Sequence, residues 1–148
     1  MALVLGLDAK MYRNSAVWAT PSWVEFTNVK DVTLSLETAE ADVTTRASGG
    51  WRAVVATLKE GSVESNILWD TADANFEAVK DAFFDNTSVE FAVMDGDITV
   101  EGTEGLRADF SVVNFTRNEP LEDALNVDFT IKPTASTNAP VWYVVPAP

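Results

Sequence analysis

The sequence predicts a mainly β fold, a two-sheet sandwich or barrel with one flanking helix. Three observations predict it. About seven segments alternate apolar and polar residues with the period of a strand, while a single segment has the period of a helix. The chain of 148 residues is also long enough to bury about 70% of its unfolded surface in one core. We therefore expect one domain over residues 1–148, with an N-terminal arm at 1–23 and a C-terminal tail at 134–148.

The expected strands follow one another along the chain. They are residues 24–27, 29–36, 51–58, 62–69, 89–94, 106–115 and 125–131. Glu60-Gly61 reads as a turn, and the change of apolar parity at Val113 predicts a bulge. The tail beyond Pro133 is apolar without a period, so we expect it to dock on another surface.

The helix is expected at about residues 72–85. Asp70-Thr71-Ala72-Asp73 is a start signal, because short oxygen-bearing side chains accept hydrogen bonds from the free N–H groups of a first turn. Phe76, Val79 and Phe83 then share one stripe, and Asn86 is a plausible stop.

A long polar excursion separates the strand patterns at 29–36 and 51–58. A hairpin arm is expected there, at about residues 37–52, because its tip is too long for a tight turn. Long loops in a compact domain are usually functional or disordered. The acidic residues of the arm precede its basic residues, and this order suits a head-to-tail contact with a second copy of the chain. A solvated tip with scattered charges is the alternative, and loop length alone does not separate the two.

The composition argues against the usual chemistries. The chain contains no cysteine and no histidine, so thiol chemistry and the commonest general base are absent. We expect no enzyme, no metal and no cofactor. The net charge of −13 disfavours nucleic-acid binding, since affinity for phosphates comes from Lys and Arg. Solubility alone also accounts for such acidity. No apolar run approaches the roughly 20 residues of a membrane span, so no membrane contact is expected.

Two local motifs are better explained by structure than by chemistry. Asp95-Gly96-Asp97 resembles a catalytic carboxylate pair, but acids flanking a glycine usually form a turn. As a calcium loop it fails, because Val100 stands where Gly is required. Trp51 and Trp69 lie in strand patterns and are expected in the core, whereas the tryptophans of the terminal segments point to subunit contacts.

Several stretches together resemble the tail tube (major tail) proteins of bacteriophages. They are Asn28 to Leu36, Glu40 to Arg46, Gly49 to Ala53, Ala92 to Ile98, Gly105 to Phe110 and Asn114 to Glu122. The resemblance covers roughly residues 6–142 in the same order. It implies a β-sandwich subunit with one helix, similar in fold to the tube proteins of type VI secretion and contractile injection systems.

The resemblance also implies partners and a location. Homo-hexameric rings would stack head to tail into a hollow tube in the tail of the virion, assembled in the cytoplasm of the host bacterium. Double-stranded DNA would pass through the lumen without specific binding. The tube would grow on a tail tip along a tape measure protein and end at a terminator protein.

Three groups of residues are then expected at contacts. The assembly arm carries Glu40, Asp42, Thr44, Thr45, Arg46, Trp51 and Arg52. Candidates for the lumen are Asp109, Asn126, Asp128 and Thr130, which occupy the polar, solvent-facing sides of long expected strands. Candidates for terminal contacts are Trp18, Trp23, Trp142 and Tyr143. Deleting Thr38 to Gly49 is expected to leave a folded subunit that does not polymerise. The competing hypothesis is a carbohydrate-binding or capsid-decorating β-sandwich that uses its tryptophans.

Overall fold

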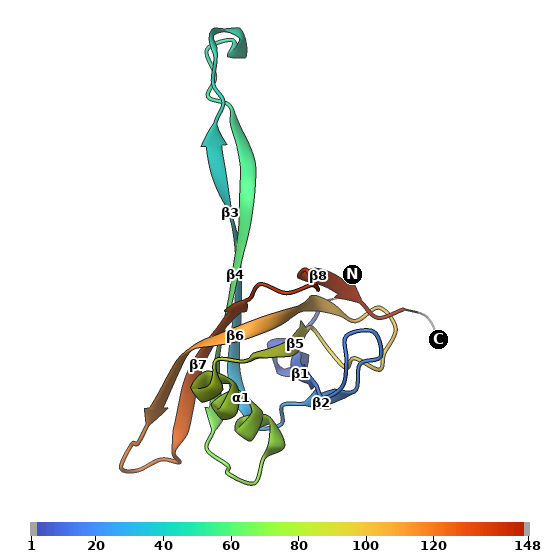
Figure 1. Cartoon of the computed structure of the whole chain (residues 1–148), viewed down its shortest axis with the longest axis vertical. Helices are drawn as coiled ribbons and strands as arrows, with labels where there is room; N and C mark the ends of the chain where they lie inside the picture. Colours follow the sequence, from blue (N-terminus) through green and yellow to red (C-terminus); the bar gives the residue numbers. More distant parts are fainter. Residues whose placement is uncertain (1–2, 147–148) are drawn as a thin grey trace.

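The computed structural model describes residues 3–146 and shows one eight-stranded antiparallel sheet with one α-helix (Figure 1). The strands are β1 (Lys10–Asn14), β2 (Trp23–Glu25), β3 (Val29–Asp42), β4 (Val54–Leu68), β5 (Ser88–Met94), β6 (Glu104–Asn118), β7 (Asn126–Pro133) and β8 (Val141–Val144). The helix α1 (Ala74–Asp85) follows β4, and short 3-10 turns lie at Gly6–Asp8 and Arg46–Ser48. The strand order is β2-β1-β5-β6-β7-β4-β3, and β8 pairs with β6.

The prediction of a mainly β fold with one helix is therefore confirmed. Hydrogen bonds join all eight strands into a single sheet, in which β6 is shared by two halves. Residues 105–111 of β6 pair with β5, and those from Phe110 onward pair with β7. The register shifts between Val112 and Asn114, which confirms the predicted bulge. A bulge bends and twists a strand, so this one turns the two halves relative to each other.

The helix packs on one face of the sheet and closes the main core. Phe76 and Val79 are fully buried among Ile67, Phe110 and Phe129. Asp73 caps the first turn by accepting the Asn75 backbone N–H at 3.1 Å, and Asn86 ends the helix in the left-handed conformation. Both ends thus lie within two residues of the prediction.

The turn expected at Glu60-Gly61 is wrong, because β4 runs unbroken from Val54 to Leu68. Gly61 stands opposite Leu36 in the neighbouring strand. A Cβ atom at Gly61 would lie 3.1 Å from the Leu36 side chain, so glycine serves close packing here. The two strands expected at 51–58 and 62–69 are one long strand.

The long pair β3–β4 leaves the body of the molecule as a narrow hairpin (Figure 1). We call residues 38–59 the arm and residues 43–53 its tip. Strand pairing continues to the pair Asp42–Val54, well inside the segment expected to be an irregular loop. Alanine is weakly represented in strands, and the alternation of Ala39 and Ala41 with Glu40 and Asp42 was therefore easy to miss.

Segments near both ends of the described chain belong to the sheet. Residues 10–14, expected within an N-terminal arm, form β1 between β2 and β5. The C-terminal tail docks as expected, as strand β8 along β6. A second, smaller core lies on the sheet face opposite α1, where Tyr12, Ala92, Met94 and Ile98 pack with Trp23 and Tyr143.

Candidate assembly surfaces

The tip of the arm is an ordered cap. Thr44 bridges the two strands, because its hydroxyl accepts the Ala53 backbone N–H at 2.8 Å. Thr45 and Ser48 form a capping box around the 3-10 turn. Gly49 and Gly50 follow with φ of 65° and 84°, a region that favours glycine. The tip therefore has a defined shape without contacting the body.

The charges on the arm are arranged as the sequence predicts. Glu40 and Asp42 lie on β3, while Arg46 and Arg52 lie in the tip. The Thr44 hydroxyl and the Thr44 backbone N–H lower the pKa of the Asp42 carboxyl below its usual value. Arg52 approaches Asp42 only to 3.9 Å, and its side chain is 88% exposed. The guanidinium is thus available to another molecule.

Large apolar side chains on the arm have no core to enter. Trp51 is 80% exposed and Leu58 is 79% exposed. The expectation that Trp51 belongs to the core is wrong, because the strand pattern around it lies in the arm. Trp69 does pack beside the core, with its ring 4.6 Å from that of Phe76. A monomer gains nothing from an exposed tryptophan at the end of an arm.

A continuous polar face covers one side of β3, β4, β7 and the end of β6. Cross-strand partners share a face, and the pairs Thr33–Glu64, Asn66–Asp128 and Thr116–Asp128 define this one. The exposed charged side chains that cross-strand pairing places on it are Asp31, Glu37, Glu60, Glu64, Asp128 and Lys132. We call this surface the polar face; it is strongly acidic.

The structure brings three of the four lumen candidates together on the polar face. Asn126, Asp128 and Thr130 alternate along β7 with the buried Val127, Phe129 and Ile131. Asp128 accepts the side-chain amides of Asn66 at 2.5 Å and Asn118 at 2.6 Å, which orders the surface.

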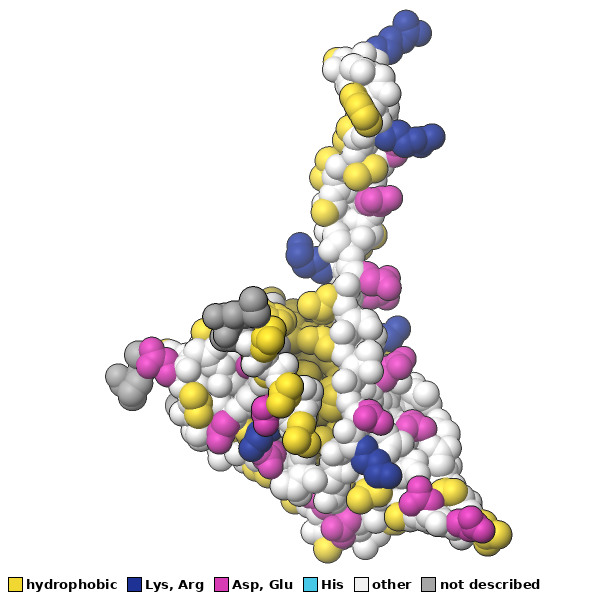
Figure 2. All heavy atoms as spheres, turned by 180° about the vertical axis from the view of Figure 1, so that it is seen from behind, with side chains coloured by type: hydrophobic (Ala, Val, Ile, Leu, Met, Phe, Trp, Pro, Cys, Tyr) yellow, Lys and Arg dark blue, Asp and Glu magenta, His cyan; other side chains and the backbone are white. Residues whose placement is uncertain are grey.

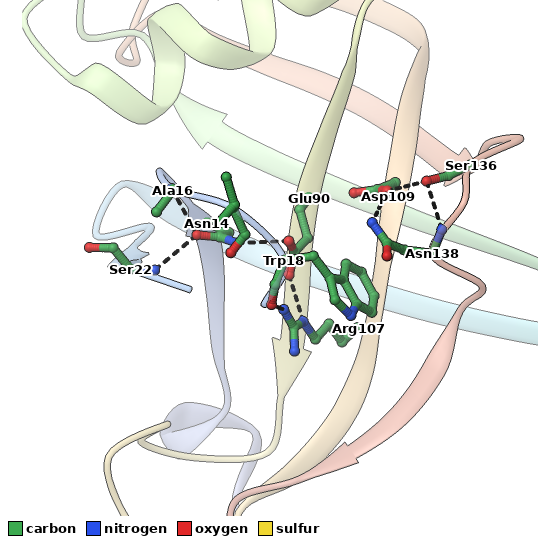
Figure 3. A network of polar contacts seen from close by, with 10 residues as sticks. Asn14, Ala16, Trp18, Ser22, Glu90, Arg107, Asp109, Ser136 and Asn138 are labelled. Atoms are coloured by element: carbon green, nitrogen blue, oxygen red, sulfur yellow. Dashed lines mark hydrogen bonds and ion pairs between the residues drawn. The ribbon is translucent and has the colours of Figure 1, made fainter. Parts of the chain in front are cut away.

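Asp109, the fourth lumen candidate, lies apart from the other three. Ser136 and Asn138, in the link from β7 to β8, donate to its carboxylate (Figure 3). The link therefore binds this carboxylate, which lies where β6 pairs with β5 and away from Asp128.

The strands that carry the polar face end in two free edges. β3 is the last strand of the sheet, and among the described residues no strand pairs with its outer edge. β6 is paired with β5 only as far as Ser111, so residues 112–118 have one edge without a described partner strand. A free edge presents unpaired N–H and C=O groups that another chain can pair with.

Arg107 gathers three of the four terminal aromatic residues. Its guanidinium carbon lies 4.0 Å from the ring centroid of Trp18, 5.1 Å from Trp23 and 5.5 Å from Tyr143. It also donates to Glu90 at 2.6 Å and to the Trp18 carbonyl (Figure 3). These aromatics thus pack within the subunit, whereas Trp142 is 54% exposed.

The N-terminal segment between β1 and β2 is held by one buried amide. Asn14 accepts the backbone N–H groups of Ala16 and Ser22 and donates to Glu90 at 2.7 Å (Figure 3). This network links β1, β5 and β6. No pattern in the sequence signals it, because Asn14 and Glu90 lie 76 residues apart.

The acidic motif at Asp95-Gly96-Asp97 has a structural role in the described part of the chain. No group of three or more Asp and Glu side chains within residues 3–146 is placed to hold a metal ion. The carboxylates of Asp95 and Asp97 accept backbone N–H groups of Glu104 and Thr99, as expected for a turn. No helix described here has the length and apolar character needed to cross a membrane.

Residues 12–136 match the phage tail tube protein family. The chain belongs to that family. It is therefore a structural component of the virion tail and not an enzyme, and the family match decides against the carbohydrate-binding hypothesis. A comparison with curated proteins gives no significant match.

Solved structures share the fold of this tail tube protein at low sequence identity. The tail of an empty gene transfer agent particle, refined with C6 symmetry, has a TM-score of 0.72 at 17% identity, covering 95% of this chain and 98% of that one. The SPP1 tail tube has a TM-score of 0.69 at 17% identity, covering 88% of this chain and 75% of that one. The six-fold symmetrised anti-feeding prophage baseplate has a TM-score of 0.61 at 8% identity, covering 98% of this chain and 99% of that one. The predicted likeness to contractile injection systems is thus confirmed at the level of fold.

Proposed function

We propose that six copies of this chain form a ring, that rings stack head to tail into a hollow tube, and that double-stranded DNA passes through the bore without being held. The tube would grow on a tail tip complex along a tape measure protein and end at a terminator protein. The observation that carries the proposal is the acidic polar face bounded by two free strand edges. The six-fold symmetry of the gene transfer agent tail supports the number of copies.

The two free edges explain how a ring closes. The outer edge of β3 in one copy pairs with residues 112–118 of β6 in the next. The two edges differ, so the contact is heterologous, and it generates a ring when the rotation between copies closes. The four strands β6, β7, β4 and β3 then form one continuous inner layer, and the remaining strands with β8 form the outer half of a two-sheet subunit.

The polar face turns toward the bore in this arrangement. Its excess of carboxylates repels DNA phosphates and offers few cations for counterion release, so DNA slides instead of binding. Asn126, Asp128 and Thr130 line the bore. Asp109 is left out of the bore because it lies where β6 pairs with β5, where Ser136 and Asn138 bind its carboxylate.

Thiol labelling of assembled tubes tests the bore. The chain has no cysteine, so Asp128→Cys supplies a single thiol. A small reagent should label it, whereas a polymer-linked maleimide should not. Asp81→Cys, on the exposed side of α1, is the matched control and should react with both reagents. Labelling of Asp128→Cys in intact tubes by the polymer-linked reagent would overturn the assignment.

Shortening the arm tests its part in stacking. Thr38 and Lys59 are cross-strand partners, so residues 39–58 can be replaced by Asn-Gly, which closes a two-residue hairpin. We expect a folded subunit with unchanged circular dichroism that forms rings but no tubes in negative stain. The wild-type chain, prepared in parallel, should form tubes. Tubes from the shortened variant would contradict a role of the arm in stacking.

A further inference from the structure

An apolar groove lies at the foot of the arm. Its volume is about 550 Å³, and its apolar lining comes from Leu36, Leu106, Pro133, Pro140, Val141 and Trp142. Figure 2 shows this yellow hollow between the arm and the body. Trp142 and Val141 remain 54% and 41% exposed, so nothing within the described chain fills the groove. A surface of this kind marks a contact with another molecule.

The tip of the arm carries a group that matches the groove. Trp51 is 80% exposed, and a buried tryptophan contributes a large apolar area. It cannot enter the groove of its own subunit. The seven residue steps of β4 from Val54 to Gly61 separate the tip from the groove by about 23 Å of extended hairpin.

We propose that the groove receives the tip of the arm of a second copy, with Trp51 inserted beside Trp142. The inference rests on the proposed function, because it names the acceptor for the arm between neighbouring rings. We call the exposed Trp51 side chain the knob. Knob and groove are different surfaces of one molecule. Such a contact leaves a free knob at one end and a free groove at the other, so it continues without limit along the tube axis.

Charge complementarity favours the tip over other occupants. The rim of the groove carries both signs of charge, with Glu37 and Glu60 beside Lys59 and Lys132, and the arm likewise carries Asp42 beside Arg52. Arg52 is the neighbour of Trp51 and is almost free of its weak pairing with Asp42. Figure 2 shows the basic side chains at the far end of the arm. The exposed apolar segment 3–9 is the competing occupant, but it contains no Lys or Arg to meet the rim carboxylates.

Disulfide trapping tests the contact directly. In the double variant Ala53→Cys and Val141→Cys, which keeps Trp51, each subunit carries one thiol beside Trp51 in the tip and one in the groove. Mild oxidation of assembled protein should give a ladder of covalent oligomers beyond the dimer on a denaturing gel. Each single variant is the control and should give no more than dimers. A ladder from Leu5→Cys with Val141→Cys, and none from the first pair, would assign the groove to the N-terminal segment and overturn the proposal.

Truncation of the knob gives an independent measurement. A central interface tryptophan is worth about 2 kcal/mol or more, which corresponds to about a 30-fold change in affinity. Trp51→Ala should therefore raise the critical concentration for tubes by about 30-fold or more and leave rings intact. Leu121→Ala, which removes a side chain that is 99% exposed on the β6–β7 loop, should leave the critical concentration unchanged.

Mixing two variants gives a qualitative readout. Trp51→Ala keeps an intact groove, and Leu36→Glu keeps an intact knob while blocking its groove. An equimolar mixture of preformed rings should give pairs of rings and no tubes, because each pair ends in two defective surfaces. Tubes from Trp51→Ala at the wild-type concentration would overturn this inference alone. Absence of rings in the wild-type protein would overturn the proposed function instead.

Discussion

At the scale of single residues, Arg107 joins the two ends of the chain. The side chains of Arg107 and Glu90 are only 9% and 7% exposed, and the guanidinium also contacts aromatic rings from both terminal segments. Removing one partner of a buried ion pair leaves an uncompensated charge. Arg107→Ala should therefore lower the free energy of unfolding by about 3–5 kcal/mol in denaturant titrations.

A surface arginine supplies the control for this experiment. Arg52→Ala removes a guanidinium that is 88% exposed, and it should change stability by at most about 0.5 kcal/mol. Loss of less than about 1 kcal/mol from Arg107→Ala would show that the network is not structural. Proteolysis should also reach residues 15–22 faster in Arg107→Ala, since the Trp18 carbonyl loses its donor.

Tyr12 provides a pH-dependent test of the second core. Burial raises the pKa of its phenol above the ordinary value of 10.0, although the Ile98 N–H donates to the phenol oxygen at 3.2 Å. The pKa is higher in the folded state than in the unfolded state. The stability that this shift contributes is therefore complete below about pH 10 and is lost as the pH rises through the folded-state pKa.

Phenolate absorbance measures this shift. The chain has two tyrosines, and one ionisation step should be delayed and accompany alkaline unfolding. In Tyr12→Phe the delayed step should disappear. If the delayed step persists in Tyr12→Phe, the assignment to Tyr12 is contradicted.

At the scale of elements, α1 depends on its N-cap residue, Asp73. Asp73 accepts the Asn75 backbone N–H and also a side-chain hydrogen bond from Asn28 at 3.0 Å, which ties the helix to the start of β3. Asp73→Ala should cost about 1 kcal/mol or slightly more in thermal or denaturant unfolding. Asp81→Ala, at an exposed position of the same helix, should cost almost nothing. Equal effects of the two substitutions would argue against the cap.

At the scale of the whole molecule, assembly works against the charge of the subunit. Each copy has a net charge of −13, so copies repel one another at low ionic strength. If apolar knob and groove contacts drive stacking, added salt screens the repulsion, and the critical concentration should fall between about 0.05 M and 0.5 M salt. Light scattering measures the critical concentration for assembly. A rise of this concentration with added salt would mean that the paired charges of the arm dominate.

The sequence alone determined the mainly β class, the helix and the bulge near Val113. It also placed the residues of the arm and pointed to the tail tube family. These features depend on local periodicity, on capping residues and on the order of motifs along the chain. The turn expected at Gly61 and the core position expected for Trp51 were wrong. The local pattern at Gly61 was that of a strand end, and the pattern at Trp51 was that of a buried strand. The role of each residue depends instead on its neighbours across the hairpin.

Only the tertiary structure decided which surfaces come together. β1 was missed because Met11 faces the main core and Tyr12 faces the second one, and burial on both sides removes the alternation that marks a strand. The cluster around Arg107, the separation of Asp109 from Asp128 and the groove beside Trp142 depend on strand pairing between distant segments. The periodicity of apolar residues indicates which side of a segment is buried. It does not report what covers that side, because the covering residues are chosen by long-range packing.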